Sequence, residues 1–163
     1  MRCPPIAIRA PPPSVTLRTN YVLIDYENTQ PTDLAMLRDG PFKVKVFLGP
    51  NQPKISVALA AALQGLGTNA EYVVLDAAGS NALDFHIAYY IGALSAQDTS
   101  AFFHIISKDT GFDPLIRHLK TKGIFAQRST SIALIPYFKP ALPSISDAQV
   151  EVVLAHLAKL KAA

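Results

Sequence analysis

Short apolar runs alternate with helical patterns along most of this chain, and this alternation restricts the possible folds more than any other feature. The apolar runs are rich in valine, isoleucine and phenylalanine and have the length of single strands. The expected strands are residues 21–26, 42–48, 70–75, 101–107 and 124–127. The expected helices are residues 32–39, 53–66, 82–94, 114–121 and 146–161. This order predicts an α/β fold, a three-layer α/β/α sandwich with a mainly parallel central sheet.

The second expected strand carries charge in an otherwise apolar run. Lys43 and Lys45 alternate with valines in the segment FKVKVFL. Alternation of this kind places one set of side chains on one face of a strand. We therefore expect one face of this strand to meet water, as on the edge of a sheet.

The chain has 163 residues, enough for one domain with a sizeable core. We expect a flexible proline-rich segment over residues 1–19 and a single domain over residues 20–138. Residues 139–163 are expected to form a linker and a helix whose apolar face packs on the domain or forms a homodimer seam.

Cysteine content and hydropathy restrict the class of protein further. The single cysteine, Cys3, excludes an intrachain disulfide framework and a cysteine-rich zinc site. No apolar run approaches the roughly 18–20 residues needed to cross a bilayer. The N-terminal segment also lacks the continuous apolar stretch of a secretory signal. We therefore expect a cytoplasmic protein with no membrane partner.

The formal net charge of +3 comes from three arginines in residues 1–20, so the rest of the chain is formally neutral. A global positive field is therefore no argument for nucleic-acid binding. The distribution is uneven, however, because residues 114–146 contain no acid and five basic residues: Arg117, Lys120, Lys122, Arg128 and Lys139. A basic flank beside an acidic centre suits a metal site that faces a phosphate chain, although a solvated helix face also accounts for the lysines.

Four carboxylates fall where α/β folds place their chemistry. Asp25 ends the first expected strand, Asp109 and Asp113 follow the fourth, and Asp84 lies in the first turn of the expected helix 82–94. Ligands of open α/β sheets bind outside the carboxyl ends of the strands, so we expect the four side chains to open onto one rim. Clustered carboxylates are unfavourable unless a cation neutralises them, and hard oxygen ligands suit Mg²⁺ or Mn²⁺.

Three of these acids also have a purely structural explanation. Asp84 could favour the helix dipole, Asp113 could cap the following helix, and Asp109 could be a turn residue. Asp25 has no such local explanation, because a charge that ends a buried strand is costly without a partner.

Three segments in this order resemble the PIN/NYN superfamily of nucleases. They are VLIDYENTQP, GSNALDFHIAYYIG and ISKDTGFDPLIRHLKTKG, and the resemblance covers residues 21–135. It implies a PIN-like, Rossmann-like fold and a metal-dependent endoribonuclease that uses Mg²⁺ or Mn²⁺ to cut RNA.

The resemblance also implies roles for particular residues. Asp25 would be a central metal ligand, Asp84 and Asp109 would complete the cluster, and Asp113 would bind the ion directly or through water. Two supporting residues are implied: Asn28 would hold a water or phosphate oxygen, and Ser107 would donate a hydrogen bond after the fourth strand. The segment GPNQPKI also resembles a family loop, which implies that Gln52 and Lys54 approach the substrate. Contacts to the phosphate chain of single-stranded RNA need cations, and Lys108, Arg117, Lys120 and Arg128 are the candidates. Glu27 is a further candidate ligand, although its side chain should point away from that of Asp25 if the strand continues.

Aromatic and histidine side chains near these segments have competing interpretations. Tyr26, Phe112 and Tyr137 are candidates for stacking on bases, although core packing is favoured for Phe112. The two tyrosines at positions 89 and 90 are expected in the helix core, and His104 is expected to be a hydrogen-bonded core histidine.

Two other functions stay open from the sequence. A phosphohydrolase of the haloacid dehalogenase type would use Asp25 as a nucleophile and the KDTGFD segment as its late acidic motif, but it leaves Asp84 unexplained. A non-catalytic module that binds RNA or a protein is compatible with the neutral charge of the domain.

Overall fold

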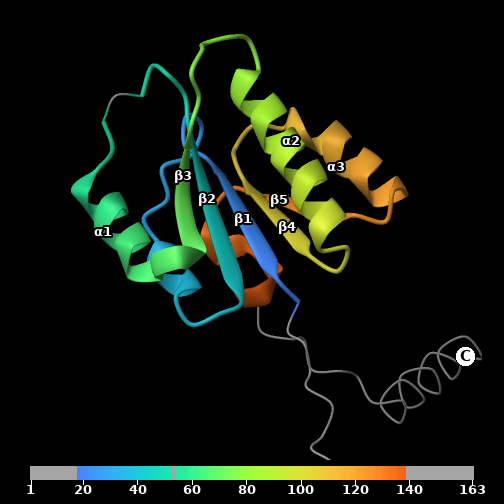
Figure 1. The fold of residues 1–163 in the computed structure, drawn as a ribbon, viewed down its shortest axis with the longest axis horizontal. Coiled ribbons are helices and arrows are strands. Elements are labelled where there is room, and N and C mark those ends of the chain that lie inside the picture. The colour runs from blue at the N-terminus through green and yellow to red at the C-terminus, as the bar shows by residue number, and fades with distance from the viewer. Residues whose placement is uncertain (1–17, 53, 139–163) are drawn as a thin grey trace, which may run out of the picture. The chain divides into compact units, whose positions relative to one another are not determined.

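The computed structural model describes residues 18–52 and 54–138. It contains one five-stranded sheet in the order β3-β2-β1-β4-β5, and all neighbouring strands are parallel (Figure 1). The strands are β1 (Asn20–Asp25), β2 (Phe42–Leu48), β3 (Ala70–Val74), β4 (Phe102–Ile106) and β5 (Phe125–Ser129). The α-helices are α1 (Val57–Leu66), α2 (Ala82–Gln97) and α3 (Phe112–Thr121). Four short 3₁₀ helices are also described: η1 (Leu34–Leu37), η2 (Gly67–Asn69), η3 (Ile132–Leu134) and η4 (Pro136–Phe138).

The chain divides into two compact units, Met1–Ala133 and Leu134–Ala163. The sheet and the three α-helices belong to the first unit. The predicted N-terminal lead before residue 18, Cys3, Lys139 and the predicted C-terminal helix 146–161 lie outside the described residues. No helix in the described part of the chain is both long enough and apolar enough to span a membrane.

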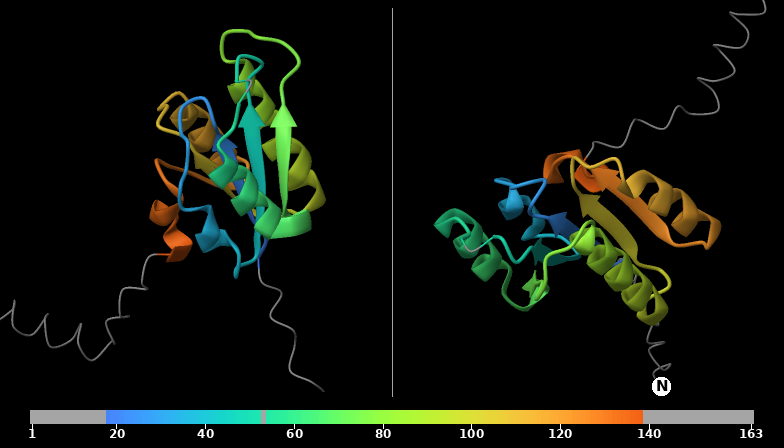
Figure 2. Two further views of the ribbon diagram at one scale, coloured as in Figure 1. Left: turned by 90° about the vertical axis from the view of Figure 1, so that its left-hand side faces the viewer. Right: turned by 90° about the horizontal axis from the view of Figure 1, so that it is seen from above.

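Helices cover both faces of the sheet, which confirms the predicted three-layer α/β/α fold. Figure 2 shows α1 on one side of the strands and α2 on the other. α2 and α3 share a core with odd-numbered residues of β1 and β4, because alternate residues of a strand point to the same face. The large side chains of this core are Tyr21, Leu23, Phe47, Leu75, Leu83, Ile87, Ile91, Phe103, Ile105, Phe112 and Leu119.

β2 is an interior strand, so the prediction that it lies at an edge was wrong. It pairs with β1 on one side and with β3 on the other, and β3 is the edge strand. Lys43 and Lys45 are in register with residues of β1 that face α2. Lys45 forms an ion pair with Glu71 of β3, and its Nζ lies 5.1 Å from the ring centroid of Tyr90. An ion pair and an aromatic ring therefore accommodate a lysine that the sequence pattern suggested would face open water.

Local capping sets the helix boundaries that differ from prediction. The Ser56 hydroxyl accepts a hydrogen bond from Leu59 N at 3.1 Å, so α1 begins at Val57 rather than near residue 53. α3 begins at Phe112, with Gly111 at the cap position, so Asp113 is inside the first turn. The structural alternative that Asp113 caps this helix was therefore wrong. Residues 32–39 contain only the short helix η1.

Burial decides between the interpretations of the aromatic residues. Phe112 is buried, as predicted, and Tyr90 packs partly buried against the core of α2. Tyr89 is 69% exposed, so its predicted place in the helix core was wrong. His104 is buried, and its Nε2 donates to Asn20 Oδ1 at 2.9 Å, while Nδ1 has no hydrogen-bond partner among the described residues.

Candidate active site at the carboxyl ends of the strands

The strand order reverses between β1 and β4, and the candidate site lies at this point. The chain runs outward from β1 to β2 and β3, and then returns to β4 on the other side of β1. Asp25 is the last residue of β1, and Ser107 directly follows β4. Crevices for ligands form at such switch points of parallel sheets, at the carboxyl ends of the strands. These ends lie at the top of Figure 1, where the loops after β2 and β3 gather.

Asp25 is fully buried and is held from two sides. Its Oδ2 accepts hydrogen bonds from Ser107 Oγ at 2.7 Å and from Asn28 Nδ2 at 2.7 Å. Its Oδ1 accepts from Asn28 N at 3.2 Å. Hydrogen bonds to a buried carboxylate offset part of the cost of removing it from water. Ser107 and Asn28 therefore fix the position of the Asp25 carboxylate.

The Ser107 hydroxyl also links Asp25 to Asp109. It accepts a hydrogen bond from Asp109 N at 3.0 Å while it donates to Asp25. The Asp109 side chain accepts from Gly111 N at 2.7 Å through Oδ1, which is the turn contact that its position beside a glycine suggested. The turn after β4 thus holds Asp109 on the same hydroxyl that fixes Asp25.

The pKa of Asp84 depends on the charges of the neighbouring carboxylates. It lies partly buried in the first turn of α2, after Asn81, whose side chain makes no capping hydrogen bond. Burial is the largest cause that raises the pKa of Asp84 to about 6, followed by the negative charges of Asp25, Asp109 and Glu27 in that order. These four carboxylates are called here the acidic rim, and Asp84 is close enough to each of the other three for their charges to disfavour its ionised form.

Glu27 belongs to this rim, although the sequence suggested that it points away from Asp25. That expectation assumed that β1 continues, whereas β1 ends at Asp25 and the alternation of side chains ends with it. The Glu27 carboxylate lies directly over Gly49, where a Cβ atom would collide with it. A glycine after β2 therefore makes room for this acid, a signal that is visible in the sequence only once the sheet order is known.

Asp113 differs from the four acids of the rim because a cation already neutralises it. Arg128 Nε donates to Asp113 Oδ1 at 2.8 Å, and the second guanidinium nitrogen donates to Oδ2 at 3.2 Å. The hydrogen bond and the charge of Arg128 lower the pKa of Asp113. Arg128 also donates to the backbone oxygen of Ser107 at 3.3 Å. This ion pair therefore braces the turn that holds Asp25 and Asp109.

Most of the predicted RNA-binding residues are exposed, and two of them are engaged in hydrogen bonds within the protein. Lys108, Arg117 and Lys120 are exposed, whereas Arg128 is engaged by Asp113. In the loop after β2, the Gln52 side chain donates to Lys54 O at 3.0 Å, and Lys54 is exposed.

The chemistry of the rim suits the divalent cation that the sequence resemblance implies. Its donors are all carboxylate oxygens, the ligands that Mg²⁺ and Mn²⁺ prefer. Within residues 18–52 and 54–138, no lysine or arginine forms an ion pair with these four acids. In the same residues, no group of three or more His, Cys, Asp or Glu side chains is arranged to hold a metal ion. The residue types therefore fit the ion, and the side chains would have to move together to share it.

Replacing Asp84 with asparagine is expected to stabilise the metal-free protein at neutral pH. The pKa of Asp84 is raised to about 6 from 3.8, so the folded state loses stability as the pH rises through this range and the carboxyl ionises. Asparagine carries no charge, so D84N should gain about 1 kcal/mol over the wild type at pH 7, a figure reduced for solvent screening. Urea unfolding of both proteins at pH 4 and pH 7 measures this difference. A D84N protein that is less stable than wild type at both pH values would contradict it.

Comparison with known proteins assigns the chain to a protein family. The PIN7 family model, described as PIN domain, matches residues 19–129. Neither the curated proteins nor the solved structures give a match. The matched residues include the whole sheet, the three α-helices and every carboxylate discussed above. The chain belongs to the PIN domain family, within the nuclease superfamily that its sequence segments resemble.

Proposed function

We propose that this protein is an endoribonuclease of the NYN type, which hydrolyses RNA phosphodiester bonds with Mg²⁺ or Mn²⁺ held at the acidic rim. Membership of the PIN domain family supports a nuclease in general. The observation that supports the metal-dependent activity most is the electrostatics of Asp84, whose pKa is raised in part by three neighbouring acids. A cluster of this kind is tolerable at neutral pH chiefly when a cation neutralises it.

The burial and the hydrogen bonds of these acids suggest the role of each one. Asp25 would be the central ligand, because it is buried and its carboxylate is held by Ser107 and Asn28. Asp84 and Asp109 would complete the ligand set. Asp113 would reach the ion through water, because Arg128 already contacts both of its oxygens. When bound, the ion supplies positive charge to the phosphate and lowers the pKa of a water molecule.

Exposed cations would hold the phosphate chain of a single-stranded RNA on either side of this rim. Lys108, Arg117 and Lys120 lie in and after the turn that follows β4, and Lys54 lies in the loop after β2. Phosphate contacts of this kind position a nucleic acid without reading its sequence. The cytoplasm is the location that we expect for this activity.

A direct test measures Mn²⁺-dependent cutting of a fluorescent single-stranded RNA together with thermal stability. The proposal predicts cleavage with Mn²⁺, none with a chelator, and a rise in Tm with Mn²⁺ that D109N lacks. A protein with no metal-dependent shift and no cleavage would instead be a non-catalytic module. Efficient cleavage of a small phosphomonoester through a trapped phospho-aspartate would favour the phosphohydrolase.

A further inference from the structure

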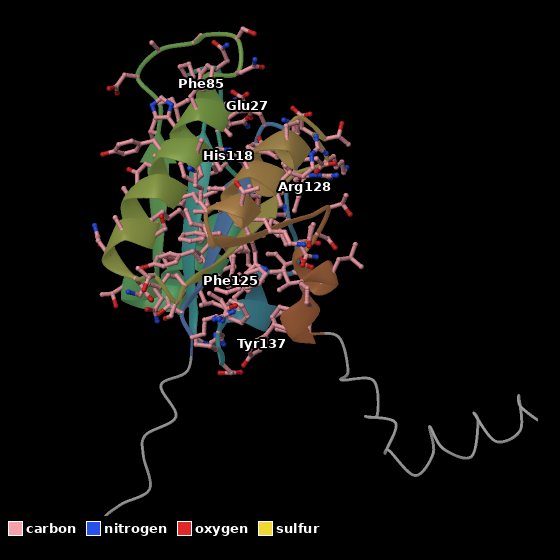
Figure 3. All side chains as sticks on the ribbon, turned by 90° about the vertical axis from the view of Figure 1, so that its right-hand side faces the viewer. Glu27, Phe85, His118, Phe125, Arg128 and Tyr137 are labelled. Atoms are coloured by element: carbon pink, nitrogen blue, oxygen red, sulfur yellow. The ribbon has the colours of Figure 1, made fainter. Side chains whose placement is uncertain are left out.

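Two aromatic side chains on α2 face the solvent beside the acidic rim. Phe85 directly follows Asp84 in the chain and is 68% exposed, and Tyr89, one helical turn further on, is 69% exposed. In Figure 3, Phe85 and Glu27 lie at the same end of the molecule, where the strands finish. Phe85 and Tyr89, called here the α2 aromatic pair, therefore begin at the turn of α2 that carries Asp84 and extend one helical turn away from it.

The α2 aromatic pair contributes little to the core. Leu83, Ile87 and Ile91 bury the opposite face of α2. From Phe85 to Gln97 the helix contains no Lys, Arg, Asp or Glu, so no charged side chain solvates its outer face. An outward face with large flat rings and no negative charge can accept the bases of a nucleic acid without repelling its phosphates.

Cations lie beyond the α2 aromatic pair, along the side of α2 that faces β2. Tyr89 contacts Tyr90 edge to face, with ring centroids 5.6 Å apart. The Nζ of Lys45 is 5.1 Å from the Tyr90 centroid. Lys43 is exposed and forms no ion pair within the described part of the chain, and its Nζ lies 5.8 Å from the ring centroid of Tyr21. Aromatic rings interleaved with cations are typical of surfaces that bind single-stranded RNA.

We propose that the α2 aromatic pair stacks on two successive bases of the single-stranded RNA substrate as the strand leaves the acidic rim, with Lys43 near its phosphates. Side chains four residues apart on a helix have Cβ atoms about 5–6 Å apart, a spacing that lets neighbouring bases each meet one ring. This role also gives a reason for an exposed lysine, Lys43, on an interior strand. The proposal rests on RNA as the substrate, and stacking implies little preference for base identity.

The test measures RNA binding without a divalent metal, so that no cleavage is needed. Fluorescent single-stranded oligonucleotides are compared with copies in which one nucleotide at a time lacks its base. The wild type should lose affinity about tenfold when either of two adjacent bases is missing. F85A and Y89A should each bind intact RNA about tenfold more weakly, and each should become insensitive to one of those two missing bases.

Matched variants separate stacking from general hydrophobicity. F85W should keep the affinity because it keeps a flat ring, whereas F85L should not, although it stays apolar. V57A, at an exposed apolar residue of α1 on the other side of the sheet, should bind as the wild type does. The exposure of Phe85 means that these variants should fold, which their thermal unfolding checks.

The outcomes distinguish this proposal from the nuclease proposal. Binding that depends on Phe85 and on the base, in a protein that never cuts RNA, would support the aromatic pair and remove the nuclease. Metal-dependent cleavage with wild-type binding by F85A and Y89A would overturn the aromatic pair and leave the nuclease intact. Loss of a dimer in the F85A/Y89A variant, with RNA binding unchanged, would make this face a protein interface and overturn the proposal. Absence of RNA binding by the wild type would overturn it as well.

Discussion

D25N is expected to cut RNA at least about a thousandfold more slowly than the wild type, with its fold intact. Asp25 is the most fixed acid of the rim, being fully buried and hydrogen-bonded to Ser107 and Asn28. Asparagine has nearly the same shape but removes the negative charge that a divalent cation needs. A loss of about 4 kcal/mol of transition-state stabilisation corresponds to this factor, and metal catalysis contributes several kcal/mol. Single-turnover cleavage of a labelled RNA at saturating Mn²⁺ measures the rate.

Two further substitutions of the same kind make the D25N result interpretable. D39N changes an exposed acid in the loop before β2 and should cut RNA at the wild-type rate. D113N should lose less activity than D25N, because Asp113 is neutralised by Arg128 and does not contribute to the raised pKa of Asp84. Wild-type cleavage by a folded D25N protein would contradict the assignment of Asp25 as the central ligand.

The protein is expected to lose about 3 kcal/mol of stability from His104 alone as the pH falls from 7 to 4. Burial of its side chain lowers the pKa of His104 to about 4 from 6.5. The unfolded chain therefore binds a proton in this range that the folded chain does not. The stability due to neutral His104 is present above pH 6.5 and is lost as the pH falls toward 4.

Urea unfolding of the wild type and of H104Q at pH 7 and pH 4.5 tests this effect. H104Q should be less sensitive to acid, because glutamine does not titrate, although it should be less stable at pH 7 where the Asn20 contact changes. H86Q is the matched control, because it makes the same replacement at an exposed histidine of α2. Equal acid sensitivity of H104Q and the wild type would contradict the role of His104.

The fold was largely predictable because the apolar pattern reports strands directly. Every predicted strand lies within a few residues of an observed one, and β2 matches its predicted range completely. Strand order was harder, because it depends on pairing between segments distant in sequence. Lys43 and Lys45 suggested an edge, but Glu71 and Tyr90, which accommodate Lys45, come from other parts of the chain. The pattern of one strand cannot contain that information.

The sequence predicted which acids form the candidate site, but not the side chains that contact them. The positions of Asp25, Asp84 and Asp109 at strand and helix ends already indicated one rim, since the geometry of parallel sheets brings those ends together. The ion pair between Asp113 and Arg128 spans fifteen residues and depends on the docking of α3 against β5. Tyr89 is exposed because it lies on the face of α2 that meets solvent. The sequence of a helix that is apolar on all sides does not indicate which face that is.

A crystal of the wild-type protein soaked in Mn²⁺ and examined by anomalous scattering near the manganese edge would show whether the acidic rim binds a divalent cation. We expect a single strong anomalous peak, or two close peaks, within coordination distance of carboxylate oxygens from Asp25, Asp84 and Asp109. Absence of manganese from these three carboxylates at a concentration that supports RNA cleavage, or a peak bound elsewhere, would contradict this expectation.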